Sequence, residues 1–189
     1  VYKRQEIGRV LANLSEKGMA YEKDGATWLS SVEFGDDKDR VLIKSDGEYT
    51  YLTPDVAYHR NKFERSDWLI NVWGADHHGY IARMKAAMQA LGYDSDALTV
   101  QVTQLVKLLR AGEEVKLSKR QGDIIELRSI IEEIGADATR FMYLLQSVDS
   151  KQTFDLELAA SQAMDNPVYY VQMAYARLCS IERLSLIHI

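Results

Sequence analysis

Apolar residues recur at helical spacing near both ends of the chain. The first stripe predicts a helix over residues 6–17 that ends at Gly18, since glycine commonly follows the last helical turn. The second predicts a helix over residues 167–183, with Asn166 as its cap and Pro167 at its first position. Stripes of this kind are typical of helices that pack one face on a core. The apolar positions are Ile7, Val10, Leu11 and Leu14 in the first stripe, and Val168, Val171, Tyr175 and Leu178 in the second.

Short apolar runs separated by polar turns follow the first helix. They predict strands over residues 27–34, 40–43 and 48–51. Asp46 and Gly47 form a strong signal for a hairpin turn between the last two strands. This segment therefore predicts an antiparallel β insertion.

A strand, helix, strand pattern comes next. Residues 68–73 are almost entirely apolar, as expected of a strand that is buried on both faces. The chain then turns at Gly74 into a helix that ends at Gly92, and residues 98–105 predict another buried strand. This order predicts a parallel α/β unit with a right-handed crossover.

The pattern changes from α/β to all-α near residue 127, which marks a domain border. Asp137 is expected to cap a helix over residues 138–148, with an apolar side that includes Phe141 and Leu144. We find neither an internal repeat nor a low-complexity tract. The predicted organisation is a partial α/β domain over 6–126, a helical connecting segment over 127–164, and the start of an all-α domain over 165–183.

Composition limits the classes of protein to consider. The chain has 189 residues, of which 47% are hydrophobic, enough for one domain or one domain and part of another. The net charge of −5 gives no global attraction to nucleic acid, so an RNA contact must use a local basic patch. Cys179 is the only cysteine, which fits a reducing cytoplasm. Neither a membrane-spanning apolar run nor a signal peptide is visible, and we expect no membrane partner.

Both ends of the sequence look foreign to the rest. Residues 1–5 and 184–189 resemble translated read-through of a sequencing adapter, and the chain does not begin with methionine. We therefore expect these tips to be non-native and the chain to be an internal fragment of a longer protein.

The densest candidate chemistry lies in a basic loop at residues 116–120. Lys116, Ser118 and Lys119 stand just ahead of a glycine, behind a hairpin expected from the pairing of residues 106–109 with 114–117. Lysine ammonium groups suit phosphate oxygens, and glycine lets the backbone turn sharply beside them. The alternative is a solvated basic turn with no ligand.

A second candidate is the pair Tyr51 and Asp55. Thr53 as a cap and Pro54 at the first turn predict a helix that runs to about Phe63. A phenol and a carboxylate four residues apart can converge on one ligand, and both are natural acceptors for the five donors of a guanidinium. The alternative is that Asp55 only favours the helix N-terminus through the helix dipole.

A third candidate follows the predicted strand over 68–73, where open α/β sheets bind ligands. Gly74 allows a nucleotide to approach closely, Asp76 is an acceptor for a ribose hydroxyl, and His77 or His78 suits adenine or a phosphate. Asp76 is also expected to cap the following helix. Another alternative is a metal site made by these three side chains with His59, which we disfavour because adjacent histidines point apart on a helix.

Taken in order, these segments resemble bacterial arginyl-tRNA synthetases of class I. The basic loop resembles the lysine-serine-lysine signature of that class, with Leu117 where methionine is commoner. The likeness covers nearly the whole chain between the tips. The segments that carry it are residues 22–29, 33–42, 51–58, 74–80, 113–120 and 166–172.

The resemblance implies the C-terminal half of a Rossmann-like catalytic domain with an antiparallel β insertion, followed by the start of an all-α anticodon-binding domain. It implies ligation of arginine to its tRNA with ATP and Mg²⁺, and no metal held by the protein itself. Tyr51, Asp55 and Asp76 would bind arginine. ATP would be bound by Gly74, Asp76, His77 and His78 together with Lys116 and Lys119. Catalysis on the triphosphate would use Lys116, Ser118 and Lys119.

One departure from the family pattern concerns the histidine-isoleucine-glycine-histidine signature, which this sequence does not contain. We therefore expect the fragment to be inactive alone. We expect the full-length protein to be a cytoplasmic monomer. The alternatives are another class I synthetase of the glutamyl type, a noncatalytic tRNA-binding derivative, and a metal hydrolase. The pair Tyr51 and Asp55 discriminates against the glutamyl type, whose site should present an arginine to its acidic substrate.

Overall fold

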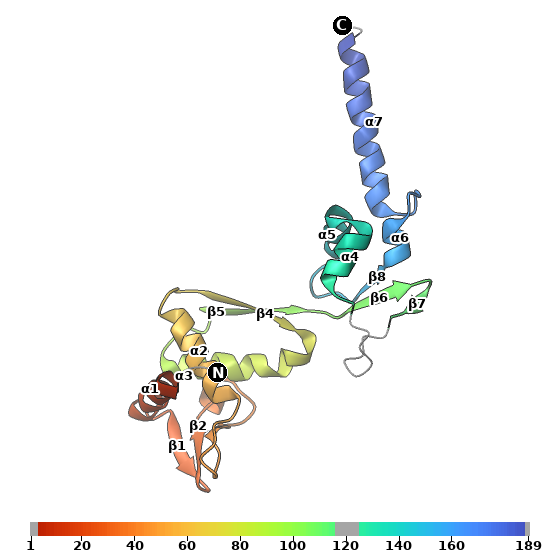
Figure 1. Cartoon of the computed structure of the whole chain (residues 1–189). Coiled ribbons are helices and arrows are strands. Elements are labelled where there is room, and N and C mark those ends of the chain that lie inside the picture. Colours follow the sequence, from red (N-terminus) through yellow and green to blue (C-terminus); the bar gives the residue numbers. More distant parts are fainter. Residues whose placement is uncertain (1–3, 116–124, 188–189) are drawn as a thin grey trace. The chain divides into compact units, whose positions relative to one another are not determined.

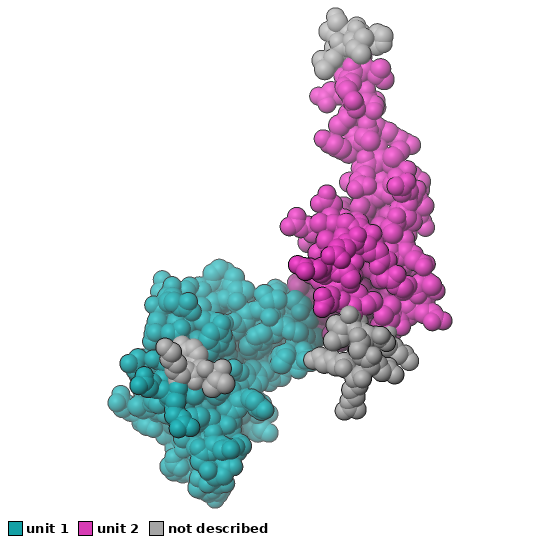
Figure 2. All heavy atoms as spheres, in the orientation of Figure 1, with its two compact units in different colours: residues 1–103 teal, residues 104–189 magenta. Residues whose placement is uncertain are grey.

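The computed structural model describes residues 4–115 and 125–187. The chain divides into two compact units, residues 1–103 and residues 104–189, which Figure 2 shows in different colours. Within the described ranges, no helix combines the length and the apolar character needed to cross a membrane.

The first unit begins with helix α1 (Arg4–Glu16), which confirms the predicted helix to within two residues. Gly18 then takes a φ of 71°, a left-handed conformation that glycine adopts without strain. Three strands follow and form an antiparallel sheet in chain order, which confirms the predicted insertion (Figure 1). They are β1 (Ala20–Lys23), β2 (Ala26–Leu29) and β3 (Arg40–Ile43).

Two of the predicted strands are wrong in extent. The strand expected over 27–34 ends at Leu29, and a short 3₁₀ helix, η1 (Val32–Phe34), replaces its second half. The chain turns there because the Ser31 hydroxyl donates to the Lys38 carbonyl. The strand expected over 48–51 is only an isolated bridge between Ile43 and Tyr49.

Helix α2 (Leu52–Phe63) begins two residues before Pro54, and the cap predicted at Thr53 is wrong. Thr53 is buried, and its hydroxyl donates to the Leu42 carbonyl over 2.6 Å. The Thr53 hydroxyl therefore bonds to the β insertion instead of capping the helix. This bond connects α2 to β3.

The predicted parallel unit is confirmed by β4 (Leu69–Gly74) and β5 (Leu98–Thr103), which pair in parallel along their whole length. A 3₁₀ turn, η2 (Ala75–Tyr80), and helix α3 (Ile81–Leu91) connect them. The expected burial of β4 on both faces is wrong, because its residues Ile70 and Val72 are 55% and 66% exposed. The alternate residues Leu69 and Asn71 face the interior instead.

One apolar core holds the first unit together. Helices α1, α2 and α3 all contribute to it, as do the antiparallel sheet and the first residues of β4 and β5. The side chains with essentially no exposed surface are Leu14, Leu29, Leu42, Val56, Met84 and Met88. The elements α2, β4 and η2, which hold candidate site residues, therefore pack against the same core.

The second unit contains a sheet in the order β7-β6-β8. Strand β6 (Val106–Arg110) pairs antiparallel with β7 (Glu113–Glu114), which confirms the predicted hairpin. Its other neighbour is the parallel strand β8 (Gln152–Asp155), so the expectation of purely helical structure after residue 127 is wrong. The buried core includes Leu108, Phe154 and Leu156.

Among the described residues of this unit, four helices accompany the sheet, and α7 continues well beyond the other three (Figure 1). The predicted cap at Asn166 is confirmed, since its side-chain oxygen accepts from the Val168 amide over 3.0 Å. The predicted cap at Asp137 is wrong because Gly135 holds the cap position, and Leu144 on the expected apolar side is 82% exposed. The helices are α4 (Leu127–Ile134), α5 (Ala136–Leu144), α6 (Leu156–Ala160) and α7 (Pro167–Ile187).

Candidate functional site

Helix α2 presents one face to a cavity of about 370 Å³ in the first unit. The side chains that reach it from this helix and the residue before it are spaced by four, three, one and three positions, which places them on one side of the helix. The end of β4 and the η2 turn supply the other wall. The lining residues are Tyr51, Asp55, Tyr58, His59 and Lys62 from the α2 segment, and Asn71, Trp73, His77 and Tyr80 from the other wall.

The half-buried carboxylate of Asp55 is the acidic group of this cavity. The Tyr80 hydroxyl donates to its Oδ2 atom over 3.1 Å. Burial raises the pKa of Tyr80 well above its ordinary value, and the neighbouring carboxylate raises this pKa further. Tyr80 therefore remains a neutral donor, and Asp55 keeps its second oxygen for another hydrogen-bond donor.

A directed chain of hydrogen bonds lies behind Asp55. Lys62 donates to the Asn71 oxygen over 3.0 Å, and the Asn71 amide nitrogen lies 2.7 Å from Nε2 of His59. Nδ1 of His59 lies 2.8 Å from the Asp55 carbonyl oxygen. An ammonium group can only donate, so Asn71 must donate to Nε2, and His59 carries its proton on Nδ1. This relay of Lys62, Asn71 and His59 joins both ends of α2 to β4.

Burial keeps the relay uncharged at His59. His59 and Asn71 are 4% and 5% exposed. Loss of hydration lowers the pKa of His59 below its ordinary value, and the positive charge of Lys62 lowers it further, against the bond to the Asp55 carbonyl. Burial also lowers the pKa of Lys62, whose ammonium nitrogen lies 4.5 Å from the ring centroid of Tyr58.

Aromatic rings enclose the side of the cavity that β4 and η2 form. The ring of Trp73 meets that of Tyr80 edge to face at 5.8 Å between centroids, and it lies 6.4 Å from that of His77. Tyr51 stands at the opposite side and is 93% exposed. Flat apolar walls around one carboxylate suit an elongated cation whose charged end is planar, such as a guanidinium.

The structure brings together only some of the site residues that the sequence predicts. Tyr51, Asp55 and His77 line the same cavity. Gly74, Asp76 and His78 belong to the adjacent turn and do not line it. Lys116, Ser118 and Lys119 lie outside the described residues, so their predicted roles stay predictions.

One expectation about the turn after β4 changes. The predicted cap at Asp76 is wrong, because Gly74 holds the cap position of η2 and Tyr80 that of α3. A Cβ atom on Gly74 would lie 2.7 Å from a carboxylate oxygen of Asp76. The absence of a side chain at Gly74 therefore makes room for the Asp76 carboxylate. Asp76 and His77 approach to 3.5 Å, but in ranges 4–115 and 125–187 no three His, Cys, Asp or Glu side chains are placed to hold a metal ion.

Several cavity residues were not singled out as ligands from the sequence. Their spacing along α2 was a usable signal, since positions 51, 55, 58, 59 and 62 repeat on one helical face. Asn71 was also visible as a lone amide in an apolar strand, and such a buried group needs partners. The residues missed as cavity walls are Tyr58, Lys62, Asn71, Trp73 and Tyr80.

Comparison with known proteins points to one family. The family model described as tRNA synthetases class I (R), catalytic domain, matches residues 1–181. The arginine–tRNA ligases of Halalkalibacterium halodurans and Bacillus subtilis are each 56% identical over 184 residues, which is 97% of this chain and 33% of each relative. The chain therefore spans about a third of the length of these curated relatives.

Solved structures agree with this comparison. A crystal structure of a Campylobacter jejuni arginyl-tRNA synthetase matches with a TM-score of 0.84 and 42% identity, over 94% of this chain and 39% of that one. The arginyl-tRNA synthetase of Thermus thermophilus shares the fold with a TM-score of 0.70 at 19% identity, over 96% of this chain and 40% of that one. These relatives are named as arginyl and not as glutamyl enzymes.

Proposed function

Since this chain belongs to the catalytic-domain family of class I arginyl-tRNA synthetases, we propose that it is part of an enzyme that joins arginine to its tRNA with ATP. The cavity along α2 is the arginine pocket in this proposal. ATP enters with its Mg²⁺ as a substrate, and tRNA is the second partner. The proposal also keeps a cytoplasmic location, in line with the single cysteine of this chain, and a monomeric full-length protein, as the family resemblance implies.

One observation carries the assignment of the arginine pocket. Asp55 is half-buried among aromatic rings, has one oxygen held by Tyr80, and makes no ion pair with any residue that the structure describes. Lys62 lies in the same cavity but donates to Asn71 instead. A carboxylate in such a place favours a cationic ligand, because Lys62 acts on its charge only through space and no described cation is bonded to it.

The relay behind Asp55 supports this role by holding the first turns of α2. His59 donates to the backbone oxygen of Asp55 and so limits how far that residue can move. A guanidinium that donates two parallel bonds requires a carboxylate whose orientation is set in advance. The exposed ring of Tyr51 then closes the side of the pocket next to solvent.

The remaining roles follow the family pattern. The arginine carboxylate attacks the α-phosphate of ATP, a new carboxyl oxygen–phosphorus bond forms, and pyrophosphate leaves. Gly74, Asp76, His77 and His78 contact ATP in this proposal, and Asp76 also borders arginine. Lys116, Ser118 and Lys119 stabilise the charge on the triphosphate, since positioned cations are the main source of catalysis in phosphoryl chemistry.

Titration of arginine into the 189-residue chain, followed by calorimetry, tests the pocket. We expect Asp55→Asn to weaken arginine binding about tenfold or more, because a charge-assisted pair becomes a neutral one. Asp67→Asn is the matched control, since Asp67 is exposed and lies outside the cavity. Lysine and glutamate should bind more weakly than arginine. Equal arginine affinities of the Asp55 and Asp67 variants would show that the guanidinium binds elsewhere.

A further inference from the structure

Asp55 is held at two points, one on its backbone and one on its side chain. Within helix α2, the Nδ1 atom of His59 lies 2.8 Å from the Asp55 carbonyl oxygen. From the wall that η2 forms, the Tyr80 hydroxyl donates to the Oδ2 atom over 3.1 Å. The first contact limits movement of the backbone, and the second limits rotation of the carboxylate. The bond from Tyr80 therefore sets the plane in which the two carboxylate oxygens lie.

The ring of Tyr80 is itself held by its neighbours. It packs against the apolar core of the first unit and meets the ring of Trp73 edge to face. The guanidinium carbon of Arg83, three residues later in the chain, lies 5.0 Å from the Tyr80 ring centroid. A cation at this distance from an aromatic ring is attracted by the ring quadrupole. Because these contacts fix the ring, they also fix the direction from which its hydroxyl reaches Asp55.

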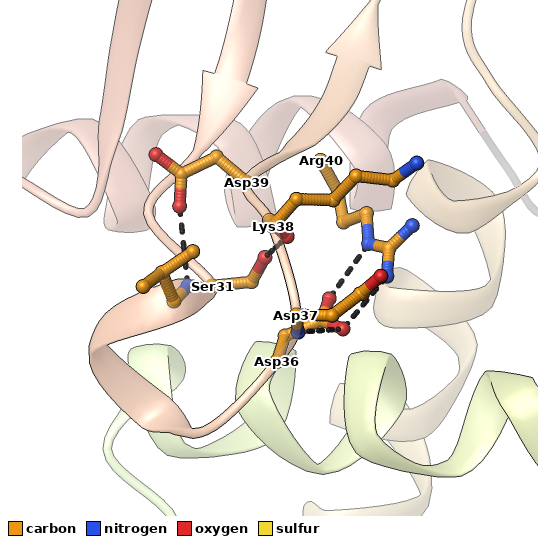
Figure 3. A network of polar contacts seen from close by, with 7 residues as sticks. Ser31, Asp36, Asp37, Lys38, Asp39 and Arg40 are labelled. Carbon is orange, nitrogen blue, oxygen red and sulfur yellow. Dashed lines mark hydrogen bonds and ion pairs between the residues drawn. The ribbon is translucent and has the colours of Figure 1, made fainter.

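Neighbouring cations are engaged elsewhere. Arg40 lines a second cavity, of about 310 Å³, that shares Tyr80 as a wall residue with the first. Its Nε and Nη2 atoms donate to the two oxygens of the buried Asp36 over 2.7 Å each (Figure 3). Lys62 makes its hydrogen bond to β4. The neutral hydroxyl of Tyr80 thus orients Asp55 without neutralising its charge, which stays available for a cationic ligand.

A carboxylate of fixed orientation discriminates between two kinds of cation. A guanidinium is a planar fork, and its two parallel N–H groups bond both carboxylate oxygens only when the two planes coincide. The ammonium group of lysine is a compact charge with rotatable donors, so it accepts a carboxylate in many orientations. Loss of the hydroxyl that orients Asp55 should therefore weaken a guanidinium ligand more than an ammonium ligand.

We propose that Tyr80 is a positioning residue, which acts through Asp55 and gives the pocket its preference for arginine over lysine. This inference rests on the proposed function, because it takes the cavity along α2 as the arginine pocket. It extends that function by assigning the choice between two cationic amino acids to one hydroxyl group. If Tyr80 only stabilised the fold, its hydroxyl would affect the two amino acids alike.

Calorimetric titration of the 189-residue chain with arginine and with lysine tests the preference. Tyr80→Phe keeps the ring and removes only the hydroxyl. We expect arginine to bind about fivefold more weakly to this variant, and the affinity for lysine to change less than about twofold. The control Tyr93→Phe should leave both affinities unchanged, since Tyr93 stacks on Phe63 and lies outside the cavity lining. An equal loss for the two amino acids, or no loss for either, would overturn the proposal.

Carbon-13 NMR of the ligand-free chain tests the hydrogen bond itself. With labelled aspartate carboxyl carbons, the signal of Asp55 is identified as the one that Asp55→Asn removes. We expect this signal to shift in Tyr80→Phe and to stay in place in Tyr93→Phe, because only the first substitution removes a donor to the Asp55 carboxylate. An Asp55 signal that does not move in Tyr80→Phe would refute the positioning role without any ligand.

Asp55→Asn separates this inference from the proposed function. If this variant keeps the arginine affinity of the unsubstituted chain, the guanidinium binds elsewhere, and both the pocket and the role of Tyr80 are refuted. If it loses arginine binding while Tyr80→Phe keeps the ratio of arginine to lysine affinity, the pocket stands and only the role of Tyr80 is refuted. Loss of arginine binding in Asp55→Asn together with a lower ratio in Tyr80→Phe supports both.

Discussion

Helices α1 and α7 carry the same kind of apolar stripe, yet only one of the two stripes is covered. On α1, Ile7, Val10 and Leu14 are at most 4% exposed. On α7, Val168 is buried, but Val171, Tyr175 and Leu178 are 49% to 70% exposed. Helix α1 contacts both α2 and α3, whereas α7 contacts α5 near its start and continues past it (Figure 1).

The difference shows what a hydrophobic pattern specifies. Spacing of 3.6 residues determines which face of a helix is apolar, but burial also requires a complementary surface on another element. In the first unit that surface comes mainly from α2 and α3. We therefore expect equal substitutions on the two stripes to have very unequal effects.

The largest expected effect is that of Leu14→Ala on α1. Removal of a fully buried leucine side chain should lower the free energy of unfolding by about 3 kcal/mol, from lost burial and the cavity left behind. All three tryptophans, Trp28, Trp68 and Trp73, lie in the first unit, so urea unfolding followed by tryptophan fluorescence measures this unit alone. A loss below about 1 kcal/mol would mean that α1 is not integral to the core.

Asp36→Asn tests a buried polar contact of the same unit. Arg40 would keep its charge but lose its buried carboxylate partner, and we expect a loss of about 2 kcal/mol in urea unfolding. The control Glu6→Gln removes an exposed pair with Arg9 and should cost less than about 0.5 kcal/mol. Since pairing lowers the pKa of Asp36, its contribution should be complete above pH ~4 and be lost as the pH falls below that value.

The pH dependence near neutrality tests the relay behind Asp55. The folded state lowers the pKa of His59, so the unfolded chain binds a proton first and stability falls as the pH drops below about 6.5. We expect the unfolding free energy to fall progressively below that pH, measured by urea unfolding at a series of pH values. His59→Gln should flatten this dependence; an unchanged slope would assign it to other groups.

The smallest effect is expected for Leu178→Ala on α7. Because Leu178 is 65% exposed, the substitution should change the free energy of unfolding of the second unit by less than about 0.5 kcal/mol. Far-UV circular dichroism during urea unfolding is the suitable measurement, since this unit has no tryptophan. A loss comparable to that of Leu14→Ala would show that something covers α7 in solution and would remove the contrast between the two stripes.

Local patterns in the sequence predicted most elements of the fold, because periodicity and turn residues act over short distances. The limits of α1, the existence of strands β4 and β5, and the Asn166 cap all follow from neighbouring residues. Thr53 shows where this reasoning fails, because its hydroxyl bonds to the Leu42 carbonyl, eleven residues earlier in the chain. Strand β8 was missed because it pairs with β6 across more than forty residues.

In the candidate site, too, local spacing predicted some residues and contacts between distant segments were missed. Tyr51 and Asp55 were found from spacing along one helix, and the structure places both on one cavity. The bond from Tyr80 to Asp55 and the pairing of His59 with Asn71 join α2 to η2 and β4, so no local pattern predicts them. The proposed roles of Lys116, Ser118 and Lys119 stay predictions, because these residues lie outside the described ranges.

The relay of Lys62, Asn71 and His59 has an evolutionary consequence. Its bonds run one way, since lysine cannot accept and the histidine ring receives the amide proton. Exchange of Asn71 for aspartate would remove that proton, leave Nε2 without a donor and favour a charged ring in the interior. Relatives that keep His59 should therefore also keep the amide at position 71 and a donor at position 62, and their sequences can be inspected for this combination.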